Sequence, residues 1–126
     1  MIDIGNNNTI IITQGNSAII DITPIDVETG EPIVLEDGDK VLFTVKTQGG
    51  IKKLQKELTK DDYTDVEDTS LNCVIHPSDT IAWGVGDYVY DCLLITNDGE
   101  AITFISSAFR LLRALGKITD VGDNDD

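Results

Sequence analysis

Few side chains in this sequence are of the types that carry out covalent or metal chemistry. The chain has one histidine, His76, and two cysteines, Cys73 and Cys92. A structural zinc site takes four Cys or His ligands, so these three residues do not suffice. No serine or cysteine stands in a nucleophile motif. The 23 acidic residues could include an acid–base pair, but no spacing singles out two of them.

The densest acidic stretch is DDYTDVED at residues 61–68. It lacks the alternating acidic order of an EF-hand loop, and no late bidentate glutamate follows it. We interpret it as a solvated turn rather than a calcium site. No metal or other cofactor, and no small-molecule substrate, is expected from the residue patterns.

Trp83, next to Gly84, admits two interpretations. An exposed indole would offer a stacking platform to a carbohydrate, whereas a buried one would pack in the core or anchor a loop. Core packing is the favoured interpretation, and the platform stays open as the alternative.

The two cysteines occupy alternate, apolar-facing positions of predicted strands. A buried thiol behaves as a small apolar side chain. The N-terminal residues MIDIGNNNT lack the positive charge and apolar core of a secretory signal. We therefore expect synthesis in the cytoplasm and two reduced thiols rather than a disulfide.

The charge of the chain is strongly acidic, with nine Lys and Arg against 23 Asp and Glu and a net charge of -14. This balance argues against nucleic acid and anionic membranes as partners. No apolar run approaches the roughly 18 residues of a membrane helix. Six of the nine cations lie between residues 40 and 60, and residues 61–109 contain none.

The lysine-rich segment has two interpretations. It can be a solvated edge strand, whose lysines discourage aggregation. Alternatively, it can be a basic patch that meets an acidic patch on a neighbouring copy. The second interpretation makes this segment the candidate interface, comprising Lys46, Lys52, Lys53 and Lys56.

The strongest local signal is a hairpin over residues 86–112, centred on Asn97-Asp98-Gly99. A three-residue loop there pairs Thr96 with Glu100. The face predicted to be buried then contains Tyr88, Tyr90, Cys92, Leu94, Ile102, Phe104 and Ala108. A two-residue loop would instead place Asp91 opposite Ser106, and we favour the first register because it segregates apolar from polar side chains.

Further strands are predicted at residues 9–13, 17–23, 40–47 and 71–75, and Ser78 is predicted to cap a short helical turn. Residues 51–58 fit a helix or an edge strand, and we favour the strand as a hairpin partner for 40–47. About seven short strands with at most one helical turn indicate an all-β, antiparallel β-sandwich. We expect an N-terminal arm (1–8), one domain (9–114) and a disordered acidic tail (115–126).

The order of turn motifs resembles the immunoglobulin-like domain at the N-terminus of phage baseplate upper proteins, and related short structural proteins of tailed phages and prophages. The motifs are TQGNS (13–17), D-x-x-T-G-x-P (26–32), LEDGDKVLFTVK (35–46), HPSDT (76–80), GDYVYD (86–91), NDG (97–99) and a last strand at 102–109.

This resemblance implies an immunoglobulin-like sandwich and a non-enzymatic tail or baseplate module. Such a module docks other virion proteins and forms homo-oligomers. Its expected location is the virion, after assembly in the cytoplasm of the bacterial host. A carbohydrate-binding or adhesive β-sandwich, with Trp83 as its platform, is the alternative function.

Overall fold

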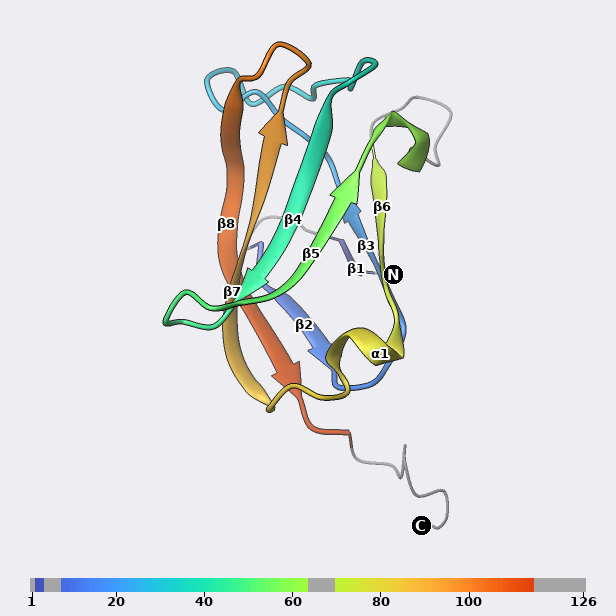
Figure 1. Cartoon of the computed structure of the whole chain (residues 1–126), viewed down its shortest axis with the longest axis vertical. Coiled ribbons are helices and arrows are strands. Elements are labelled where there is room, and N and C mark those ends of the chain that lie inside the picture. Colours follow the sequence, from blue (N-terminus) through green and yellow to red (C-terminus); the bar gives the residue numbers. More distant parts are fainter. Residues whose placement is uncertain (1, 4–7, 64–69, 115–126) are drawn as a thin grey trace.

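The computed structural model describes residues 2–3, 8–63 and 70–114, which form eight strands and two short helical segments (Figure 1). The predicted tail at 115–126, most of the predicted arm at 1–8 and residues 64–68 of the acidic stretch lie outside the described residues. Within the described ranges, no helix is long and apolar enough to cross a membrane.

The strands form two sheets, so the chain is an all-β protein. The larger sheet has the order β2 (Ile10–Thr13), β8 (Ala101–Leu112), β7 (Gly86–Ile95), β4 (Lys40–Lys46) and β5 (Lys52–Leu58). The smaller sheet has the order β1 (Ile2–Asp3), β3 (Ala18–Ile22) and β6 (Leu71–Ile75). The edge strands β5 and β6 come into contact where the two sheets approach (Figure 1).

The core lies between these sheets and follows the alternation of side chains along each strand. Both sheets contribute fully buried residues to one apolar cluster, including Val41, Phe43 and Val45 of β4 and Cys73 of β6. Successive side chains of a strand point to opposite faces, so every second residue can be apolar and buried. The apolar-facing positions predicted for Cys73 and Cys92 are confirmed, since both side chains are fully buried.

Residues 52–58 are the strand β5, which confirms the strand interpretation of the ambiguous segment. β5 pairs antiparallel with β4, and Lys56 lies opposite Phe43. The helical spacing of its leucines is therefore incidental, since the neighbouring strand supplies the backbone hydrogen bonds.

The prediction of purely antiparallel pairing is wrong at two places, where β1–β3 and β2–β8 run parallel. Residues 14–17 carry the chain from β2 in the larger sheet to β3 in the smaller one, so these consecutive strands do not pair. The backbone N–H of Gly15 donates to Thr80 Oγ1 at 3.0 Å, and Gln14 Nε2 donates to the Trp83 carbonyl at 2.6 Å. These bonds hold the crossing in place.

The hairpin of β7 and β8 has the predicted three-residue loop, with Gly99 at φ +96° and a 2.9 Å bond from the Thr96 N–H to the Glu100 carbonyl. Beyond the loop, Leu94 pairs with Ile102. A β-bulge then shifts the register, so that Asp91 faces Ser106 as in the register not favoured above.

The bulge arises because the buried apolar residues of β8 stand at an even-numbered position near the loop and at odd-numbered positions further along the strand. Phe104 and Phe109 are both buried, yet they are five positions apart, an odd offset that would place them on opposite faces of a regular strand. One extra residue on this strand brings both rings to the core. As a consequence, Ala108 is exposed. Ile102 keeps its predicted place opposite Leu94 but is 37% exposed rather than part of the buried face.

The two helical segments are η1 (Lys60–Asp62) and α1 (Pro77–Thr80), one more than predicted. The N-cap of α1 is His76 rather than Ser78, because Pro77 already occupies the first helical position. The carboxylate of Asp79 accepts the His76 backbone N–H at 2.8 Å. After this turn, the Tyr88 hydroxyl donates to the Gly84 carbonyl at 2.6 Å and secures the start of β7.

Candidate functional site

The predicted interface lies on the β4–β5 hairpin at one edge of the larger sheet (Figure 1). Among the described residues, β5 has a strand partner only on its β4 side. The side chains of Leu54, Lys56 and Leu58 are at least partly buried, whereas those between them are exposed. An edge strand of this kind leaves backbone N–H and C=O groups available to a partner.

The tip of the hairpin is a tight, hydrogen-bonded turn. The Thr47 N–H donates to the Ile51 carbonyl at 2.8 Å, and the Ile51 N–H donates to Thr47 Oγ1 at 3.0 Å. Gly50, at φ +97°, takes the left-handed conformation that closes the turn. Ile51 projects from this turn with 67% of its surface exposed, the largest fraction among the exposed large apolar residues of the described chain.

The structure divides the four candidate lysines into two groups. Lys46 Nζ lies 3.9 Å from Asp91 Oδ2, and Lys56 Nζ lies 2.9 Å from Asp79 Oδ2. Lys52 and Lys53 are exposed, and neither has an ion-pair partner among the described residues. Lys52 lies opposite Lys46 on the neighbouring strand, so like charges gather at the hairpin tip.

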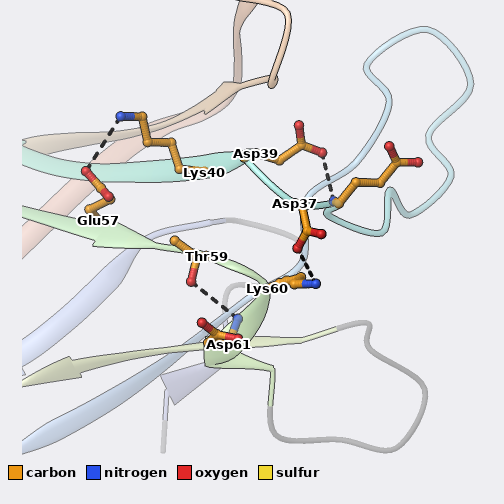
Figure 2. A pocket seen from close by; sticks show the side chains of 9 residues that line it. Asp37, Asp39, Lys40, Glu57, Thr59, Lys60 and Asp61 are labelled. Carbon is orange, nitrogen blue, oxygen red and sulfur yellow. Dashed lines mark hydrogen bonds and ion pairs between the residues drawn. The ribbon is translucent and has the colours of Figure 1, made fainter.

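At the other end of β5 is a pocket of about 330 Å³, which Figure 2 shows. Lys40 Nζ lies 3.8 Å from Glu57 Oε1, and Lys60 forms an ion pair with Asp37. The hydrogen bond to Asp37 raises the pKa of Lys60. Both lysines of this pocket already have carboxylate partners, and the lining also includes Glu36, Asp39 and Asp61. The pocket therefore carries an excess of negative charge and offers no attraction to an anionic ligand.

A second pocket, of about 290 Å³, was not foreseen from the sequence. It lies between the segment 25–33 and the ends of β7 and β8 that flank the hairpin loop. Its lining combines apolar and acidic side chains: Ile25, Asp26, Val27, Glu28, Ile33, Leu94, Glu100 and Ile102. These segments are distant in sequence, so no local sequence motif indicates the pocket.

Trp83 is 7% exposed. Its ring lies 5.2 Å from that of Tyr88 and 6.0 Å from that of Phe109, centroid to centroid. A buried indole presents little surface to a sugar, so its placement favours core packing over the platform.

The residues with potential for covalent or metal chemistry lie apart or are buried. Cys73 and Cys92 are free and buried. Burial raises the pKa of the Cys73 thiol to about 12 and raises that of Cys92 further, so neither is an activated nucleophile. Across residues 2–3, 8–63 and 70–114, no three His, Cys, Asp or Glu side chains are grouped to hold a metal ion.

Comparison with known proteins gives no family model and no curated protein that matches this chain in sequence. Among solved structures, the chain is similar to the N-terminal domain of phage TP901-1 ORF48. The sequence identity is 17%, the TM-score is 0.49, and the alignment covers 86% of this chain and 88% of that one. A likeness of this degree assigns neither a family nor a function to the chain.

Proposed function

We propose that this chain is a non-enzymatic structural protein of a tailed phage or prophage, a tail or baseplate module that acts by protein–protein docking. The order of turn motifs in its sequence supports the phage assignment, since it resembles that of baseplate upper proteins. The finer assignment of an immunoglobulin-like sandwich belongs to this proposal. Its location would be the virion, after assembly in the bacterial cytoplasm.

The observation that carries the docking role is the tip of the β4–β5 hairpin. A rigid turn presents Ile51, Lys52 and Lys53 together, with the apolar side chain exposed and both ammonium groups without partners in the described chain. Pre-ordered backbone lowers the entropy lost on association. The rest of the chain is acidic, so this tip is suited to an acidic, partly apolar surface on a protein.

The proposed partners are other tail proteins and further copies of this chain. Charge complementarity contributes to such contacts, so salt should weaken them. Of the four candidate lysines, Lys52 and Lys53 are available for this role, whereas Lys46 and Lys56 already pair with Asp91 and Asp79.

Mass spectrometry of gradient-purified phage particles tests the proposal. The expected result is this chain in a constant ratio to the known tail proteins, with host cytoplasmic proteins removed. The variant Lys52→Glu/Lys53→Glu should reduce its incorporation at least about tenfold, a loss typical of disrupting a contact centre. Arg113→Glu, an exposed cation elsewhere, serves as the charge control. Absence of the chain from particles would refute the virion assignment.

A further inference from the structure

The pocket between residues 25–33 and the β7–β8 loop has an apolar floor and an acidic rim. Leu94 is buried at its base, Ile102 is 37% exposed, and Val27 is 56% exposed. A volume of about 290 Å³ is ample for one branched aliphatic side chain. The exposed apolar surface of these residues would be covered by such an occupant, which is a favourable contribution to binding.

The rim of the pocket is made of Asp26, Glu28 and Glu100. None of these has a cationic partner in the part of the chain that the structure describes. The segments around it cannot supply one locally, because residues 24–39 and 61–109 contain no Lys or Arg. The rim therefore favours an occupant with an apolar side chain followed closely by positive charge.

The chain itself carries that combination at the tip of the β4–β5 hairpin. Ile51 is the exposed aliphatic side chain, and Lys52 and Lys53 follow it directly. The three side chains of the tip thus match the floor and the rim of the pocket in kind. An apolar centre with a polar rim is the general arrangement of protein interfaces.

The hairpin tip lies at one end of β4, and the segments that line the pocket lie at the other end (Figure 1). Lys40, at the start of β4, pairs with Ile95 beside the pocket, whereas Lys46, at its end, pairs with Lys52 beside the tip. Six residue steps along a strand span about 20 Å. A molecule therefore cannot fill its own pocket, and a contact between tip and pocket joins two copies head to tail.

We infer that the Ile51 side chain of one copy inserts into the pocket of the next, with Lys52 and Lys53 against Asp26, Glu28 and Glu100. Donor and acceptor surfaces differ, so the interface is heterologous and repeats from copy to copy, giving a closed ring or an open filament. This inference rests on the proposed docking function and specifies its partner, a second copy of the chain, and both contact surfaces.

Sedimentation velocity on the purified chain, over a range of concentrations, gives the first test. The wild type should form assemblies that dissociate in 1 M NaCl, where the screening length falls to about 3 Å. Ile51→Asp should weaken association at least about tenfold, whereas Ile51→Leu should retain it. Far-UV circular dichroism confirms that the variants are folded. A wild type that is monomeric at every concentration overturns the inference.

Reversal of the charges gives the sharper test. Lys52→Glu/Lys53→Glu reverses the tip, and Glu28→Lys/Glu100→Lys reverses the rim, so each variant alone should be monomeric. An equimolar mixture should assemble, because each tip then meets a pocket of opposite charge in the other variant. Continued assembly of either variant alone, or failure of the mixture to assemble, would place the contact elsewhere.

The two proposals fail separately. A chain that is monomeric in solution but present in phage particles would overturn the head-to-tail contact and leave the virion function intact. A chain that assembles through Ile51 but is absent from particles would overturn the virion function and leave the head-to-tail contact intact.

Discussion

Lys56 Nζ lies 2.9 Å from Asp79 Oδ2, and this contact joins β5 of the larger sheet to α1, which directly follows β6 of the smaller one. Both side chains are more than three-quarters buried. The same carboxylate also accepts the His76 N–H, so it caps the helical turn and pairs with the lysine at once. The ion pair therefore stabilises the contact between the two sheets.

Lys56→Met should lower the free energy of unfolding by about 1 kcal/mol, because it leaves a partly buried carboxylate without its cation. Lys53→Met is the matched control on the same strand. Its side chain is exposed and has no described partner, so it should change the value by less than about 0.5 kcal/mol. Urea unfolding measures both, and equal effects would show that the ion pair contributes nothing.

The pH dependence of stability should contain a contribution from Asp79. Burial raises the pKa of this carboxyl, but the hydrogen bonds from His76 and Lys56 outweigh it and bring the pKa below its ordinary value of 3.8. A lowered folded-state pKa means that the stabilisation is present above the unfolded-state pKa and is lost as the pH falls through the folded one.

The variant Asp79→Asn should accordingly be less stable than the wild type above about pH 5, with the difference shrinking toward about pH 2. Urea unfolding at several pH values measures this difference. A difference that does not depend on pH would assign the effect of Asp79→Asn to its shape or to the cap alone.

Phe104→Ala should lower the free energy of unfolding by roughly 3–5 kcal/mol, since Phe104 is 8% exposed and belongs to the apolar core cluster. Ile102→Ala, two residues earlier on the same strand but 37% exposed, should cost only about 1 kcal/mol. Chemical denaturation distinguishes the two. A loss below about 1 kcal/mol for Phe104→Ala would mean that Phe104 is not packed in the core.

Gly38→Ala should destabilise the protein more than Gly30→Ala. Both glycines have a positive φ, +90° and +76°, which costs a side-chain-bearing residue about 1–2 kcal/mol. A Cβ on Gly38 would also lie 2.9 Å from Asn97 Cβ, whereas nothing lies within 4 Å of one on Gly30. The crowding should add at least about 1 kcal/mol. Equal thermal shifts would contradict the contact with Asn97.

The two thiols should resist alkylation in the folded protein and react fully after denaturation. Their raised pKa keeps them protonated at neutral pH, and burial blocks access to the sulfurs. Mass spectrometry of unreduced, denatured protein should find two labels. No label on the denatured chain would indicate a disulfide, and rapid labelling of the native chain would indicate exposed cysteines.

Local alternation in the sequence determined which residues form strands and which face they bury. Val41, Phe43 and Val45 illustrate this, because the two-residue period of a strand is a property of the backbone alone. The loop at Asn97-Asp98-Gly99 is also determined locally, since these residue types favour a tight turn whatever the rest of the chain does. The segment 52–58 was the exception: its own pattern fits two structures, and only pairing with β4 makes it a strand.

Tertiary packing decided the rest. The bulge before Phe109 allows Phe104 and Phe109, an odd number of positions apart, to reach one core. The parallel pairing of β2 with β8 joins the two ends of the chain, which no local pattern indicates. The candidate site shows the same division. The sequence pointed to the lysine cluster, but only the fold pairs Lys56 with Asp79, leaves Lys52 and Lys53 without described partners, and builds an apolar pocket. Contacts between residues far apart along the chain depend on how the sheets pack. They therefore produce no periodic pattern in the sequence from which they could be predicted.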